Sequence, residues 1–179
     1  DSYIYAYWTE PDHTMHETGV ESPQTKEWLE RLDAGAERFY KSVKDTLLIV
    51  TADHGQIDIE PDCLLSHPAL VDTLERMPAI ESRCVAFKVR AGMEEAFEKE
   101  FHRAYGKDFL LFTKNEVMER RLFGPGTPNG RFEGFIGDYL AVAAGPRTIY
   151  NTWEQCQMFV GSHAGLTEGE VTVPLIIAD

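Results

Sequence analysis

The sequence has few cysteines, and their spacing matches no metal-binding or disulfide motif. Only three of its 179 residues are cysteine, and Cys63, Cys84 and Cys156 lie far apart without a CxxC motif. This argues against both a disulfide framework and a thiolate zinc site, so we expect three free thiols. The same scarcity leans toward a reducing compartment such as the cytoplasm.

Long apolar runs and basic residues are also scarce. No apolar stretch approaches the roughly 20 residues that span a bilayer, so we expect no membrane segment. Lys and Arg total 17 against 30 Asp and Glu, which gives a formal net charge of −13 at pH 7. An acidic chain repels phosphate backbones, so a nucleic-acid duplex is not an expected partner. A phosphate-bearing substrate would need metal ions to offset this charge. The sequence does not indicate the oligomeric state.

The order of apolar runs predicts an α/β fold. The aromatic run at residues 3–8 has the character of a buried strand, and helical periodicity follows over about 24–44. Residues 46–51 then form a short run with apolar side chains on both faces, which is typical of strands in a covered parallel sheet. Strand, helix and strand in that order predict a βαβ unit, and therefore a mostly parallel sheet flanked by helices.

A second alternation of strands and helices lies between turn-rich segments. The expected elements are strands at 84–89 and 109–112 and helices at 93–105 and 115–122. Proline and glycine clusters on both sides favour a small α/β insert at about 81–123 over a continuation of the main sheet. Strand character returns at 139–143 and at 171–177. Both ends of the sequence lie in apolar runs, so we expect residues 1–179 to be an internal part of a longer protein.

Three short segments beside expected strand ends carry acidic and histidine side chains. Asp12 and His16 are four residues apart, so one helical turn would put a carboxylate and an imidazole on the same face. Asp53 and His54 directly follow the apolar strand at its carboxyl end, where ligands gather in open α/β sheets. His163 lies in a glycine-flanked loop, where backbone can approach a ligand closely.

Each segment also has an ordinary explanation when it is taken alone. His13 could replace His16 as a ligand, and a polar loop with two histidines is more often solvated than metal-bound. An Asp-His pair could cap the next element, and the glycine-flanked histidine could lie in an ordinary loop. Together, however, the segments supply five oxygen and nitrogen donors of the kind that zinc binds. One ion takes three or four protein ligands, so five ligands indicate two ions and phosphoryl chemistry.

The three segments, in this order, resemble the motifs of the alkaline phosphatase superfamily, and most of all its nucleotide pyrophosphatase/phosphodiesterase branch. They are Glu10-Pro11-Asp12 with His16 and Gly19, Thr51-Ala52-Asp53-His54-Gly55, and Gly161-Ser162-His163-Ala164-Gly165. Ala164 stands where the family usually has glycine, and Met15 stands where it often has glycine. Neither departure removes a ligand, and the resemblance extends from Pro11 to Pro174.

The resemblance implies an alkaline phosphatase-like catalytic domain with two divalent ions, zinc being the expected metal. Asp12, His16 and His163 would hold one ion, and Asp53 with His54 would hold part of the other. The family's hydroxyl nucleophile and a further Asp ligand precede the first motif, in an amino-terminal half. We therefore expect no catalytic nucleophile in this chain and no activity from it alone.

The implied substrate is a small molecule, either a phosphodiester or a nucleotide pyrophosphate, hydrolysed by the intact protein. Three other activities of the same superfamily are alternatives: phosphomonoesterase, phosphonate hydrolase and phosphomutase. A non-catalytic module that binds metal is the alternative from a different class of protein.

Overall fold

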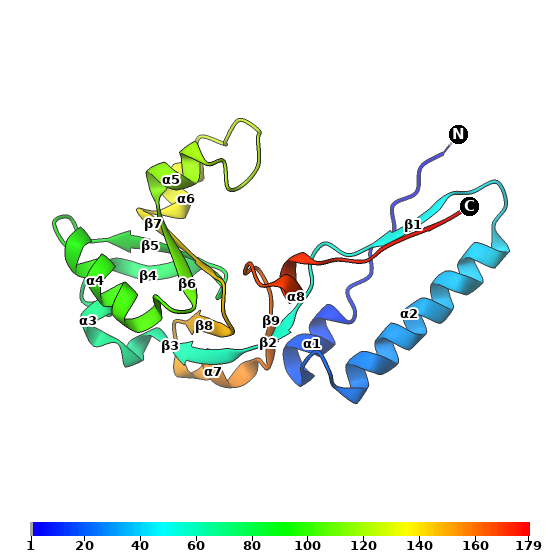
Figure 1. Cartoon of the computed structure of the whole chain (residues 1–179), viewed down its shortest axis with the longest axis horizontal. Helices are drawn as coiled ribbons and strands as arrows, with labels where there is room; N and C mark the ends of the chain where they lie inside the picture. Colours follow the sequence, from blue (N-terminus) through cyan, green and yellow to red (C-terminus); the bar gives the residue numbers. More distant parts are fainter. Residues whose placement is uncertain (1) are drawn as a thin grey trace.

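The computed structural model describes residues 2–179 as an elongated molecule of mixed α/β architecture, which confirms the expected fold class (Figure 1). One end holds the long helix α2 (Pro23–Ser42) and a ribbon of two strands, β1 (Leu48–Thr51) and β10 (Leu175–Ala178). The opposite end holds a four-stranded sheet. Between them lie four short elements: α1 (Asp12–Thr18), β2 (Ile57–Asp58), β9 (Gly161–Ser162) and α8 (Glu168–Val171).

The four-stranded sheet is antiparallel throughout, with the strand order β4-β5-β7-β6. Its strands are β4 (Leu74–Ile80), β5 (Cys84–Val89), β6 (Phe109–Thr113) and β7 (Tyr139–Ala143). Three helices accompany it: α4 (Glu94–Tyr105), α5 (Lys114–Glu119) and α6 (Phe132–Ile136). The predicted elements at 84–89, 93–105, 109–112, 115–122 and 139–143 are therefore confirmed, with small shifts at their ends.

Strand β7 is buried on both faces because helices cover both sides of the sheet. Its odd-numbered residues, such as Tyr139 and Ala141, join the larger core with Phe97 and Phe101 of α4. Its even-numbered residues Leu140 and Val142 join a smaller core with Val117 of α5 and Ile136 of α6. Alternation of side chains along a strand thus explains a continuous apolar run inside an antiparallel sheet.

Besides the pairs β1–β10 and β2–β9, a further pair of strands connects this sheet to the middle of the molecule. Strand β3 (Glu60–Cys63) pairs in parallel with β8 (Arg147–Tyr150). In the sequence, β3 is followed by the 3₁₀ turn η1 (Leu64–Ser66) and the helix α3 (Pro68–Val71), and β8 is followed by the helix α7 (Trp153–Met158). The guanidinium of Arg147 donates to the Asp62 carboxylate at 2.7 Å and to the Ala104 carbonyl at 2.7 Å. These contacts join β3, β8 and α4.

The pairing of strands differs from the parallel arrangement that the sequence predicts. Within residues 2–179, β3 and β8 form the one parallel pair, and β1 runs antiparallel to β10. Both strands of this ribbon are apolar, yet Ile49 is 55% exposed and Ile177 is 61% exposed. Apolar residues on both faces therefore indicate a strand at 46–51 but do not determine the direction of its partner.

The strand predicted at residues 3–8 is wrong. Residues 2–9 form no regular element, and Tyr3 and Tyr5 are 87% and 73% exposed. A strand needs hydrogen bonds to a neighbouring strand, and no described strand pairs with this segment. Trp8 instead approaches Trp28 of α2, with 6.4 Å between the ring centroids.

Two expectations about organisation stay predictions. The proposed insert at 81–123 lies within the lobe that contains the four-stranded sheet, and the chain's place in one catalytic domain is likewise a prediction.

Across the part of the chain that the structure describes, no helix is both long enough and apolar enough to cross a membrane. Cys63, Cys84 and Cys156 are free thiols.

Candidate metal centre

The first motif lies on helix α1, one turn of which places Asp12 and His16 on the same side. The carboxylate of Glu10 accepts hydrogen bonds from the backbone N–H of Thr14 at 3.1 Å and from its hydroxyl at 2.7 Å. This satisfies a backbone donor that the start of a helix otherwise leaves unpaired, and a negative charge is favoured at that end. The i,i+4 pair that the sequence predicts is present, since His16 Nε2 lies 3.5 Å from Asp12 Oδ1.

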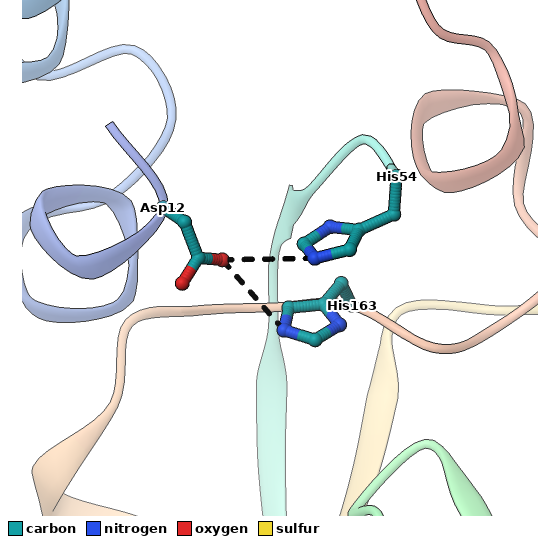
Figure 2. Close-up of side chains that lie close together, drawn as sticks. All are labelled: Asp12, His54 and His163. Atoms are coloured by element: carbon teal, nitrogen blue, oxygen red, sulfur yellow. Dashed lines mark ion pairs between the residues drawn. The ribbon is translucent and has the colours of Figure 1, made fainter. Parts of the chain in front are cut away.

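Three imidazoles from three chain segments converge on one carboxylate oxygen. The Nε2 atoms of His16, His54 and His163 lie 3.5, 4.0 and 3.7 Å from Asp12 Oδ1. Figure 2 shows His54 from the loop after β1 and His163 from the segment after β9 facing the Asp12 carboxylate. The donor atoms of Asp12, His54 and His163 all lie within 4.8 Å of one another.

Backbone carbonyls hold two of these rings in place. The Nδ1 atom of His16 is 2.8 Å from the Gly161 carbonyl oxygen, and that of His54 is 3.0 Å from the Gly55 carbonyl oxygen. A carbonyl oxygen only accepts hydrogen bonds, so in both cases Nδ1 is the donor, and Nε2 is the ring atom directed toward Asp12. This is the orientation that metal-binding histidines adopt, with the outer nitrogen held by a carbonyl or a carboxylate.

The surroundings of His163 favour its neutral form. Burial lowers the pKa of His163, and the nearby His54 and His16 rings lower this pKa further against the opposing effect of Asp12. The rings of His54 and His163 are stacked, with 3.7 Å between centroids and 19° between planes. Two stacked imidazolium ions would repel each other, whereas neutral rings retain the lone pairs that bind metals.

Asp53 lies at the edge of the cluster rather than at its centre. Its Oδ1 is 3.8 Å from His54 Nε2, and its Oδ2 accepts a hydrogen bond from the Tyr7 hydroxyl at 3.4 Å. The negative charge of Asp53 raises the pKa of Tyr7. The side chain of His13, the alternative to His16, faces Glu17 at 3.6 Å and is 69% exposed. Of the two histidines on α1, His16 is therefore the one that belongs to the cluster.

The structure adds a residue that the motifs did not single out. Gln56 is 8% exposed and lies against α1. With its amide oriented to satisfy both neighbours, its NH₂ donates to Asp12 Oδ1 at 3.1 Å and its oxygen accepts from the His16 backbone N–H at 3.1 Å. Its place directly after the Asp53-His54-Gly55 motif is the one sequence signal that could have indicated it.

A buried ion pair supports the loops that carry the histidines. Arg83 and Glu170 are 0% and 3% exposed, and the guanidinium donates to both carboxylate oxygens of Glu170. The same carboxylate accepts from the Gly165 backbone N–H at 2.8 Å, two residues after His163. The carbonyl of Glu170 accepts from the Gly55 backbone N–H at 2.7 Å, one residue after His54. One residue thus ties both histidine loops together.

The donors that converge on Asp12 fit a divalent metal ion. Zinc binds imidazole nitrogen and carboxylate oxygen at 2.0–2.2 Å, so the ligand atoms of a tetrahedral site lie about 3.3–3.6 Å apart. The separations of 3.5, 3.7 and 4.0 Å between Asp12 Oδ1 and the three Nε2 atoms are close to this value.

Comparison with known proteins places the fold in the alkaline phosphatase superfamily. The profile of the type I phosphodiesterase / nucleotide pyrophosphatase family matches residues 2–161, and the chain belongs to this family. No curated protein matches the sequence at a significant level.

Solved structures show the same fold at low sequence identity. Murine ectonucleotide pyrophosphatase/phosphodiesterase 5 is 20% identical, with a TM-score of 0.69 over 94% of this chain and 45% of that chain. An inactive variant of the same murine protein in complex with AMP has a TM-score of 0.66. Phosphonoacetate hydrolase from Sinorhizobium meliloti 1021, in complex with phosphonoformate, is 20% identical, with a TM-score of 0.63 over 93% of this chain and 43% of that chain. The chain therefore spans less than half the length of these structures.

Proposed function

We propose that this chain provides the metal-binding part of a phosphodiesterase or nucleotide pyrophosphatase. The observation that carries the proposal is the convergence of three imidazole Nε2 atoms on Asp12 Oδ1, in a chain that belongs to this family. We assign Asp12, His16 and His163 to one zinc ion and Asp53 with His54 to part of a second. The central position of Asp12 supports a close spacing of two ions, because His54 faces it as well.

The chain's own residues would bind and orient the phosphate rather than attack it. When bound, the metal ions would supply positive charge that polarises the phosphoryl oxygens. Gly161 and Gly55 would hold the imidazoles through their carbonyl oxygens, and Gln56 would hold Asp12. We place no nucleophile among residues 2–179 and expect no turnover by this chain alone. The substrate would be a small phosphoester or nucleotide, and the cytoplasmic location expected from the cysteine count stays a prediction.

Calorimetric titration with zinc tests the proposed centre. The chain should bind zinc, and His16→Ala or His163→Ala should weaken that binding by about 100-fold or more, because loss of even an outer-shell partner costs 10–100-fold. The matched control is His102→Ala, since His102 is exposed on α4 in the four-stranded lobe. Asp53→Asn should remove the second ion and leave the first.

One result would contradict the proposal. Equal zinc affinity in His163→Ala and His102→Ala would show that the cluster is not a metal site. Thermal unfolding of every variant in the presence of a chelator separates a lost ligand from a misfolded chain, because a ligand variant should match the unmodified chain under these conditions.

The related activities differ in substrate rather than in ligands. The likeness to phosphonoacetate hydrolase keeps phosphonate hydrolysis as the second candidate. Comparing a phosphodiester, a phosphomonoester and a phosphonate as substrates of the protein that carries this chain would decide among them. Greatest turnover of the phosphodiester would support the first candidate, and greatest turnover of the phosphonate would support the second.

A further inference from the structure

A cavity of about 360 Å³ opens beside the proposed metal centre. His16 and His163 belong to its lining, and so does the turn between β4 and β5. Ligand sites in proteins typically measure 300–1,000 Å³, so this cavity suits a small organic group. A phosphate held at Asp12 and the histidines would lie next to this cavity, because His16 and His163 belong to its lining.

The turn between β4 and β5, which contributes to the lining, has an uncommon conformation. Ile80 has a φ of 79°, in the left-handed region that β-branched residues rarely adopt. The next residue, Glu81, donates its backbone N–H to the Cys84 carbonyl at 3.1 Å and closes the turn. This conformation brings both Glu81 and Ser82 into the lining of the cavity. Strained backbone of this kind persists where the surrounding structure fixes it, and it is common at binding sites.

The charge of the lining has one sign. Within the described residues, Glu81 is the one acidic side chain that lines the cavity, and no lysine or arginine does. Arg83 is near in sequence, but it is 0% exposed and is bound to Glu170 and to the carbonyls of Gly145 and Arg147. An anionic group in the cavity would therefore meet a carboxylate and no lysine or arginine, and the nearest cations would be the proposed metal ions that hold the phosphate.

The remaining surfaces of the cavity suit a neutral or cationic group. Tyr150 and Phe159 stack with 5.9 Å between centroids, and their aromatic surfaces attract apolar groups and cations. The hydroxyls of Ser82 and Ser162 lie 3.3 Å apart, and each is able to donate or to accept a hydrogen bond. The cavity thus combines aromatic surface, two hydroxyls and one negative charge.

We propose that this cavity holds the organic group of the phosphoester and selects neutral or cationic groups against anionic ones. The inference rests on the proposed function, because the phosphate is taken to lie at the metal centre. It narrows the substrate class. Pyrophosphates that would place a second phosphate in the cavity, and phosphonates that would place a carboxylate there, are disfavoured. A phosphodiester with an uncharged or cationic alcohol is favoured.

Three phosphate esters of matched size test the charge preference. They are 2-hydroxyethyl phosphate, which has a neutral organic group, phosphoethanolamine, which has a cationic group, and phosphoglycolate, which has an anionic group. Their affinities for the zinc-loaded chain are measured by calorimetry at low ionic strength, with inorganic phosphate as the reference. Phosphoglycolate should bind about 5-fold more weakly than the neutral ester, the size of effect that one partly screened charge exerts across a small cavity.

Two variants of the acidic residue and one control connect the preference to Glu81. Glu81→Gln should abolish the difference between phosphoglycolate and the neutral ester, and Glu81→Lys should reverse it. For each variant, the affinity of every ester is expressed relative to that of inorganic phosphate for the same variant, so that a general effect of the substitution on phosphate binding cancels. Glu95→Gln, on the exposed surface of α4, removes the same charge away from the cavity and should change nothing.

The outcomes separate this inference from the proposed function. Zinc-dependent binding of inorganic phosphate, without a preference among the three esters, would overturn the cavity inference and leave the metal centre intact. A preference that survives in Glu81→Gln would overturn the role of Glu81 and with it the inference. Absence of zinc-dependent phosphate binding would overturn both proposals.

Discussion

Replacing Glu170 with glutamine should destabilise the protein far more than so small a change in the side chain suggests. Glutamine preserves the shape of the side chain, but it leaves the fully buried guanidinium of Arg83 without an opposite charge. Removing one partner of a buried ion pair costs about 3–5 kcal/mol. Because Arg83 also donates to the carbonyls of Arg147 and Gly145, and glutamine still accepts a hydrogen bond, we expect about 3 kcal/mol.

Thermal unfolding measures this loss directly. For a chain of 150–250 residues, 1 kcal/mol shifts the midpoint by about 2–4 °C, so Glu170→Gln should lower it by about 6–12 °C. Glu168→Gln is the matched control, because Glu168 is exposed on the same helix α8 and should change stability by less than about 0.5 kcal/mol. Equal midpoints for the two variants would refute the claim that the buried pair holds the loops together.

The acid dependence of stability provides an independent measure of the same carboxylate. Burial alone would raise the pKa of Glu170, but hydrogen bonds from Arg83, Thr167 and the Gly165 backbone N–H lower this pKa below its usual value. A carboxyl group with a lower pKa in the folded state stabilises it at pH values above the unfolded pKa of about 4.3. That contribution is lost as the pH falls through the folded pKa. The stability difference between the unmodified chain and Glu170→Gln should therefore stay constant from pH 6 to pH 8 and narrow below about pH 4.

Three further substitutions have expected outcomes that thermal unfolding checks. Ala164→Gly should stabilise the chain by up to about 1 kcal/mol, because Ala164 has a φ of 81° that glycine adopts without strain; an unchanged or lower midpoint would contradict this. Gly55→Ala should destabilise it and weaken zinc binding, because an added Cβ would lie 2.1 Å from the Gly169 carbonyl oxygen; a midpoint equal to that of the unmodified chain would be evidence against this packing. Tyr105→Phe should leave stability unchanged or raise it by up to about 1 kcal/mol, because the buried Tyr105 hydroxyl has no hydrogen-bond partner among the described residues; a clear loss would indicate a partner such as a buried water.

Local patterns account for the parts of the fold that the sequence predicted well. The helix at 93–105 is visible from apolar side chains at steps of four, and in the structure Phe97, Phe101 and Tyr105 are fully buried. The apolar run at 139–143 coincides with β7. The helix at 24–44 is also confirmed as α2, although its apolar stripe is only partly buried, with Phe39 50% exposed. Periodicity determines the type of an element, whereas burial depends on what packs against it.

Strand pairing and the residues that hold the candidate site together depend on contacts between residues far apart in the sequence. Local patterns therefore did not predict them. The direction of β1 follows from pairing with β10, more than 120 residues later. Arg83 and Glu170 are 87 residues apart, and nothing in either neighbourhood marks them as partners. Gln56 depends on the approach of α1 to the loop after β1. These residues were missed because their role exists only after the chain has folded.

The candidate metal centre depends both on local sequence patterns and on contacts that only the tertiary structure creates. The spacing of Asp12 and His16 is a local helical signal, and the structure keeps it as a 3.5 Å contact. His54 and His163 are 109 positions apart in the printed sequence, and only tertiary structure brings their rings to 3.7 Å. Three ordered motifs thus indicated the ligand types, whereas the contacts among their side chains arise from the tertiary structure. Because the loops of both histidines are joined through Glu170, zinc affinity and folding stability should change together when that residue is altered, but not when Glu168 is.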